Sequence, residues 1–129
     1  MKSFLSGYIN EDLEPKLDNI FVVSEERPVK LDAILDTGFN GELSLPVELK
    51  EKCKLEFVSV KPYELANGDI VEEDVYLAEL IINDKILVVE TTLTKSEIAL
   101  IGMELIRNRI AVFNLKDNTV KVDNNADSS

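Results

Sequence analysis

The sequence predicts a single all-β domain, and three of its features support that prediction. Short runs of β-branched and leucine residues alternate with turn residues, a pattern typical of short strands rather than of a helical bundle. The length of 129 residues is close to the commonest size for one domain, and neither a repeat nor a linker divides the chain. A hydrophobic fraction of 45% is sufficient for a packed core. We therefore expect one domain over residues 1–122 and a polar, disordered tail over residues 123–129.

Eight segments have the composition of strands, and turn residues separate several of them. Asn67-Gly68, Asn83-Asp84 and Asp117-Asn118 each predict a hairpin, because Asn, Asp and Gly tolerate positive φ. The expected strands are Phe4–Ile9, Asn19–Ser24, Val29–Leu35, Leu55–Tyr63, Ile70–Ile82, Lys85–Thr91, Arg109–Leu115 and Thr119–Val122.

Two short helices are expected among these strands. The first opens at Pro46, which is acceptable in a first helical turn, and carries Val47, Leu49 and Cys53. The second follows Gly102, where Met103, Ile106 and Arg107 have helical spacing.

The charge of the chain is strongly negative, with 25 acidic and 14 basic residues and a net charge of −11. Such a chain repels phosphate backbones and anionic lipids, so we expect no nucleic-acid and no membrane partner. No apolar stretch approaches the ~20 residues that cross a bilayer, and the first nine residues lack the apolar run of a secretory signal. A lone cysteine, Cys53, fits a reducing compartment, and the expected location is cytoplasmic.

The chain contains no histidine, which narrows its chemistry. A Ser-His-Asp triad, a Cys-His pair and a His-liganded zinc or iron site are excluded, and we expect no metal and no cofactor. A general acid or base must be a carboxylate, a lysine, a tyrosine or Cys53. Lysines beside Cys53 can lower its pKa, but the thiol has no base partner, so a packed structural cysteine is the preferred interpretation.

One aspartate lies at a position where its carboxylate needs hydrogen-bond donors. In Leu31–Pro46, LDAILDTGFNGELSLP, an apolar strand delivers Asp36 into a turn formed with Thr37 and Gly38. A carboxylate at the end of a buried strand costs desolvation free energy unless hydrogen-bond donors stabilise it. Asp36 is therefore the candidate catalytic residue, although an Asp-Thr-Gly tripeptide alone can also be an ordinary turn.

Two later segments of the chain complete a sequence pattern that begins with the Asp-Thr-Gly turn. The hairpin of residues 63–82 has its tip at Ala66, Asn67, Gly68 and Asp69, and residues 98–113 place Leu100 and Ile101 before Gly102. An apolar strand into Asp-Thr-Gly, then a hairpin, then two apolar residues and Gly resembles the retropepsin-like aspartic peptidases, especially their small prokaryotic members. The resemblance covers roughly residues 29–122.

The resemblance implies a mostly antiparallel, barrel-like fold and a site built from two aspartates. Two carboxylates ~3 Å apart repel by roughly 5 kcal/mol at an effective dielectric of ~20, so such a pair holds one proton. The chain supplies one Asp-Thr-Gly, so the second Asp36 must come from another copy in a homodimer. Thr37 is then expected to bond across the pair, and Gly38 to present its N–H to the carboxylate. Leu100, Ile101 and Gly102 are expected to pack beneath this loop, and the hairpin tip to close over a peptide or protein substrate.

Two positions differ from the retroviral pattern, where an Asp and an Arg form an ion pair near the interface. This chain has Asn40 and Met103 at those two positions, so both members of the ion pair are absent and neither charge remains without its partner. The hairpin also carries acidic residues, Glu72, Glu73 and Asp74, on its second arm. The alternative to an aspartic endopeptidase is a catalytically silent, dimeric peptide- or protein-binding module on the same fold.

Overall fold

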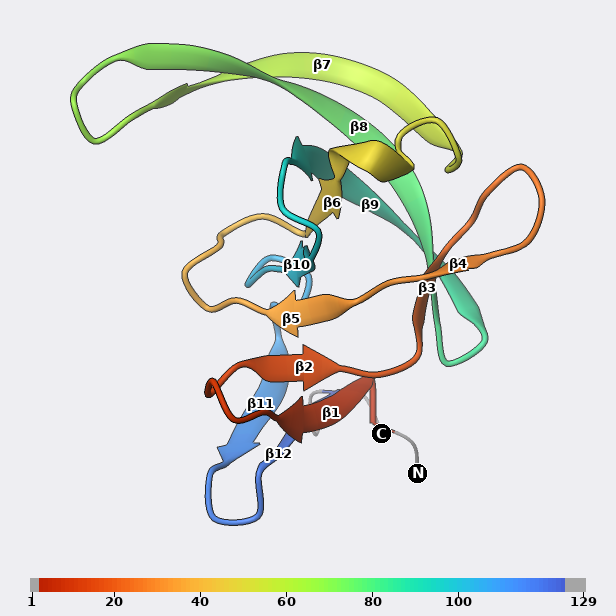
Figure 1. The fold of residues 1–129 in the computed structure, drawn as a ribbon, viewed down its shortest axis with the longest axis vertical. Coiled ribbons are helices and arrows are strands. Elements are labelled where there is room, and N and C mark those ends of the chain that lie inside the picture. Colours follow the sequence, from red (N-terminus) through yellow and green to blue (C-terminus); the bar gives the residue numbers. More distant parts are fainter. Residues whose placement is uncertain (1–2, 125–129) are drawn as a thin grey trace.

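The structure, a computed structural model, describes residues 3–124, which form one curled sheet of twelve strands and a single 3₁₀ helix (Figure 1). The predicted all-β class is confirmed. In this part of the chain no helix has the length and hydropathy to cross a membrane. The elements are β1 (Leu5–Ile9), β2 (Pro15–Leu17), β3 (Ile20–Val22), β4 (Val29–Lys30), β5 (Ala33–Leu35), β6 (Leu43–Pro46), η1 (Val47–Leu49), β7 (Leu55–Glu64), β8 (Ile70–Ile82), β9 (Lys85–Thr94), β10 (Ala99–Ile101), β11 (Arg109–Asn114) and β12 (Thr119–Asn124).

All eight expected strands are present, with changes in their extent. The segment predicted as Val29–Leu35 is divided into β4 and β5. The sequence did not predict β2, β6 and β10, which have three or four residues and are too short to show an alternating pattern. β12 includes Asp123 and Asn124, which were expected in the tail, and residues 125–129 lie outside the described part.

Both predicted helices need correction. The first is the single 3₁₀ turn η1, and Cys53 lies beyond it in an isolated bridge to Ser24. The second is a run of turns over residues 103–108, in which the N–H groups of Leu105, Ile106 and Arg107 donate to the carbonyls three residues earlier, as from Leu105 to Gly102 at 3.2 Å. An α-helix is costly to start in so short a segment, and Asn108, with a φ of 67°, ends it.

The sheet follows the order β11-β12-β1-β2-β5-β10-β6-β9-β8-β3-β4, and β7 pairs with β8. All neighbours are antiparallel except two pairs, β5 with β10 and β6 with β9. The three predicted hairpin turns are confirmed. Each has positive φ where it was expected: Gly68 at 91°, Asn83 and Asp84 at 51° and 65°, and Asn118 at 55°.

The hydrophobic core draws on strands from both ends of the chain. Its fully buried side chains include Ile20 and Leu80 from one end of the sheet and Leu43 and Ile101 from its middle. Val120, on β12, belongs to the same cluster. The short strands β5, β6 and β10 thus lie within the packed body, and their ends are held in fixed positions.

Candidate active site

Asp36 follows the last residue of β5, and two neighbouring segments hold it in place. β5 runs parallel to β10, with Leu35 opposite Ile101, and the N–H of Asp36 donates to the carbonyl of Ile101 at 2.9 Å. The N–H of Gly38 donates to Oδ1 of Asp36 at 2.8 Å, which stabilises the ionised carboxylate. The Asp36 side chain is half-buried, whereas Thr37 and Gly38 are exposed. The carboxylate is therefore supported from its own loop and remains within reach of solvent.

Gly102 lies directly against the loop that follows Asp36. A Cβ at this position would lie 2.2 Å from the carbonyl oxygen of Gly41 and 2.7 Å from that of Phe39. The segments are also joined by hydrogen bonds, from Gly102 N–H to the carbonyl of Glu42 at 3.0 Å and from Met103 N–H to that of Phe39 at 2.8 Å. Glycine is required at 102 because two backbones meet there.

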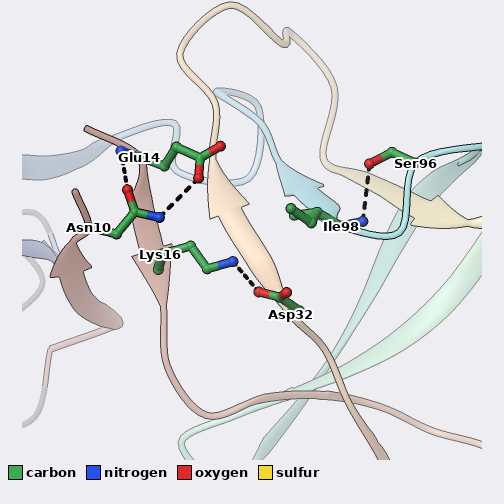
Figure 2. A network of polar contacts seen from close by, with 6 residues as sticks. All are labelled: Asn10, Glu14, Lys16, Asp32, Ser96 and Ile98. Atoms are coloured by element: carbon green, nitrogen blue, oxygen red, sulfur yellow. Dashed lines mark hydrogen bonds and ion pairs between the residues drawn. The ribbon is translucent and has the colours of Figure 1, made fainter. Parts of the chain in front are cut away.

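The approach to Asp36 is fixed at the start of β5 as well. Figure 2 shows Lys16 of β2 in an ion pair with Asp32, the residue before β5 begins. The carbonyl of Asp32 accepts from the N–H of Ala99 at 2.8 Å, and Ser96 Oγ accepts from the N–H of Ile98 at 3.1 Å in the turn leading to β10 (Figure 2). The strand that carries Asp36 is thus tied to both neighbouring strands.

The hairpin of β7 and β8 forms a long arm that extends away from the body on the side of the β5–β6 loop (Figure 1). Its tip is a closed turn, in which Leu65 N–H donates to the carbonyl of Asp69 at 2.7 Å. The predicted tip residues Ala66, Asn67, Gly68 and Asp69 are all exposed there. Asn67 Oδ1 accepts from the N–H of Asp69 at 3.0 Å, which gives the tip a defined shape.

A groove of about 510 Å³ lies between this hairpin and the loop after Asp36. Lys61, on the first arm, forms an ion pair of 2.8 Å with Glu90 of β9, and Glu90 N–H donates to Oε1 of Glu42 at 2.7 Å. The hydrogen bond and the charge of Glu90 raise the pKa of Lys61. The residues lining the groove are Phe39, Asn40, Gly41, Glu42, Leu43, Lys61, Pro62, Tyr63, Glu73, Val75, Glu90, Thr92 and Glu104.

A second hollow, of about 400 Å³, includes Asp36 and Thr37 themselves. Its other walls are the β1–β2 turn, the side chain of Ile34 and Phe113 of β11. Asn10 shapes the turn, as Figure 2 shows, because its side chain donates to Glu14 Oε1 at 2.9 Å. The turn presents Leu13, 72% exposed, beside the hollow. The candidate carboxylate therefore opens onto a largely apolar surface.

The structure brings together most, but not all, of the predicted site. Asp36 contacts the segment of Leu100, Ile101 and Gly102 through its N–H, which donates to the carbonyl of Ile101, and Thr37 and Gly38 follow it in the same loop. The hairpin tip is separate, since the groove is lined by the arms of the hairpin and not by residues 66–69. Sequence reasoning missed Glu42 and Lys61, which no local pattern connects. Among the described residues, no group of three or more acidic or cysteine side chains could hold a metal ion.

The fold is similar to that of a solved protein of known class. It matches the crystal structure of a retropepsin-like aspartic protease from Rickettsia conorii with a TM-score of 0.56 and 18% identity, over 92% of this chain and 89% of that chain. The predicted retropepsin-like fold is thereby confirmed, and at this identity the similarity is one of fold. A protein of unknown function from Legionella pneumophila matches with a TM-score of 0.41 and 18% identity, over 78% of this chain and 84% of that chain. No family model and no curated protein matches the chain.

Proposed function

We propose that this protein is an aspartic endopeptidase whose catalytic pair consists of Asp36 from two copies of the chain. The observation that carries the proposal is the setting of Asp36, half-buried at a strand end with Gly38 N–H donating to its carboxylate at 2.8 Å. A peptidase of this class needs such a carboxylate, supported in its ionised form and open to a reactant. The retropepsin-like fold supports the same assignment.

In the proposed mechanism the two Asp36 carboxyl groups share one proton. The ionised group takes a proton from a water molecule as its oxygen bonds to the peptide carbonyl carbon, and the protonated partner donates to the developing oxyanion. When the C–N bond breaks, the amide nitrogen receives a proton and leaves as an amine. Thr37 is proposed to position the pair, because it follows Asp36 on the exposed face of the same loop.

The substrate is proposed to lie in the groove beneath the hairpin arms. The groove adjoins the loop after Asp36. Its lining includes apolar residues such as Phe39 of that loop and Val75 of β8. An extended peptide can contact both the arms and the loop there. The hairpin tip, residues 66–69, is proposed to move toward this groove when substrate binds.

The test is the substitution Asp36→Asn, which keeps the side-chain shape and removes the charge. We expect cleavage of a mixed peptide library, followed by mass spectrometry, to fall by at least roughly a thousandfold, since the chemistry depends on the carboxylate. Asp84→Asn is the matched control, because it makes the same substitution at an exposed residue of the β8–β9 turn, and it is expected to leave cleavage unchanged. Cleavage that persists in Asp36→Asn would remove this residue from the mechanism.

The second candidate function is a silent peptide-binding module. Two observations favour it: the first hairpin arm is held to β9 by the Lys61–Glu90 pair, and the tip residues do not line the groove. Such a module would bind library peptides without cleaving them, and Asp36→Asn would leave that binding unchanged.

A further inference from the structure

The groove between the hairpin arms and the loop after Asp36 has an excess of acidic side chains. Its charged lining residues are Glu42, Glu73, Glu90, Glu104 and Lys61. Glu90 pairs with Lys61 at 2.8 Å, and Glu104 Oε1 accepts from Arg107 Nη2 at 3.1 Å. In residues 3–124 no lysine or arginine lies within ion-pair distance of Glu42 or Glu73. These two carboxylates are therefore available to a cation from outside the chain.

Glu42 and Glu73 lie on different elements, and both are half-buried. Glu42 Oε1 accepts from the N–H of Glu90 at 2.7 Å, which holds the side chain in place. Glu73 of β8 is opposite Lys61 of β7 in the register, but the ammonium group of Lys61 is paired with Glu90. Water and salt screen half-buried carboxylates less than fully exposed ones, so a cation placed beside them is bound more strongly.

An aromatic side chain in the same groove also favours a cation. Phe39 lines the groove and is half-buried. Its ring lies against two glycines, since a Cβ on Gly41 would be 2.7 Å from the ring Cζ and a Cβ on Gly102 would be 2.6 Å from Cδ2. The face of an aromatic ring attracts ammonium and guanidinium groups, and the apolar stems of lysine and arginine pack on such surfaces. The ring and the two carboxylates thus favour the same kind of ligand group.

We propose that this groove is a specificity site for a basic side chain, so that the substrate is an extended peptide with arginine or lysine beside Glu42 and Glu73. The inference rests on the proposed function, which places the substrate in this groove, and it names the class of substrate. A guanidinium group has enough N–H donors to bond both carboxylates, and its stem contacts Phe39. A peptide with an acidic residue at this position is repelled.

The experiment measures peptide binding to the full chain with the substitution Asp36→Asn, so that cleavage does not interfere. A randomised peptide library is captured on the immobilised protein, and the bound peptides are identified by mass spectrometry. We expect arginine and lysine to be enriched at one position. The best peptide is then made with arginine or with citrulline, which has a similar shape without the charge. By fluorescence anisotropy we expect the citrulline peptide to have a Kd at least about tenfold higher.

Two substitutions and a matched control assign this preference to the groove. Glu42→Gln and Glu73→Gln remove one charge each, and together they are expected to reduce the citrulline-to-arginine Kd ratio to less than about twofold. Glu72→Gln is the control, because Glu72 is the exposed neighbour of Glu73 on β8 and does not line the groove. It is expected to leave the ratio unchanged. Far-UV circular dichroism checks that each variant is folded.

The outcomes separate this inference from the proposed function. A library without enrichment of basic residues, or a ratio that the double substitution leaves unchanged, would overturn the specificity site. An equal fall in all three single variants would also overturn it, because the net charge of −11 would then explain the preference. Cleavage that persists in Asp36→Asn rejects the catalytic role of Asp36 and leaves the binding preference intact. Cleavage by the unmodified chain without a preference for basic residues does the reverse.

Discussion

Replacing Gly102 by alanine tests whether the loop after Asp36 is held by close backbone contact. The added Cβ would lie 2.2 Å from the carbonyl oxygen of Gly41, 2.7 Å from that of Phe39 and 2.6 Å from Cδ2 of the Phe39 ring. Favourable contacts are about 3.5 to 4 Å long, so the loop has to move by about 1 Å. Two of the three contacts are with backbone atoms, which cannot turn aside as a flexible side chain can.

The expected cost follows from the contacts that such a shift disturbs. Three hydrogen bonds join the segments: those from Gly102 to Glu42 at 3.0 Å, from Met103 to Phe39 at 2.8 Å and from Glu104 to Gly41 at 3.2 Å. Overpacking costs about 1–3 kcal/mol and each lost hydrogen bond about 0.5–1.5 kcal/mol. If one or two of these bonds break, the free energy of unfolding falls by roughly 1.5–6 kcal/mol.

Urea unfolding followed by circular dichroism measures this loss at a fixed protein concentration. Gly38→Ala is the matched control, because a Cβ there meets a single side-chain atom, Asp36 Oδ1, at 3.3 Å. Its expected loss is below about 1 kcal/mol. A Gly102→Ala variant that loses no more than Gly38→Ala would refute the reasoning, since the two backbones would then have room to separate.

Two further predictions concern charged and reactive side chains. Glu90 raises the pKa of Lys61, so their ion pair is complete at neutral pH and is lost as the pH rises through that raised value. Glu90→Gln is therefore expected to lower the titration midpoint of Lys61, measured by NMR. An unchanged midpoint would contradict the ion pair. Burial raises the pKa of the Cys53 thiol against the opposing charge of Lys52, and the residue is 7% exposed. A thiol reagent at pH 8 is therefore expected to label the native protein at least roughly tenfold more slowly than the urea-unfolded chain, and equal rates would show that the thiol is accessible.

The local part of the fold could be predicted because its signals lie within a few residues. Asn83-Asp84 and Asn118 specify hairpins through their own φ preference, and the flanking runs are long enough to show strand composition. β2, β6 and β10 could not be predicted in this way. Each is short and is stabilised by partners far away in the sequence, as when Ala33 of β5 pairs with Ala99 of β10. Their strand conformation is a product of the sheet and not of local propensity.

The residues of the candidate site also fall into two groups, those that the local sequence predicts and those that it does not. Asp36 and Gly102 could be identified because the chemistry of a supported carboxylate and of a close backbone approach demands particular residue types in a particular order. Glu42 and Glu90 could not, because their contact spans 48 residues and uses one backbone N–H and one carboxylate that any sequence can supply. The link from Lys61 to Glu90 is equally nonlocal. Such contacts can be identified only when the pairing of the strands is known.

The contacts of the Asp36 loop separate what one copy of the chain supplies from what the proposed catalytic pair needs. The loop of Asp36 is held within one copy, since the close contacts described for it come from Gly38, Ile101, Gly102, Met103 and Glu104 of the same chain. Asp36 and Thr37 line a hollow that is also bordered by residues of β2 and β5 and by Phe113 of β11. The catalytic pair proposed above needs a second Asp36, which a copy related by a two-fold axis would supply. If that proposal holds, Asp36→Asn should remove peptide cleavage and leave the association of the two copies unchanged, because the loop is held by contacts within its own chain.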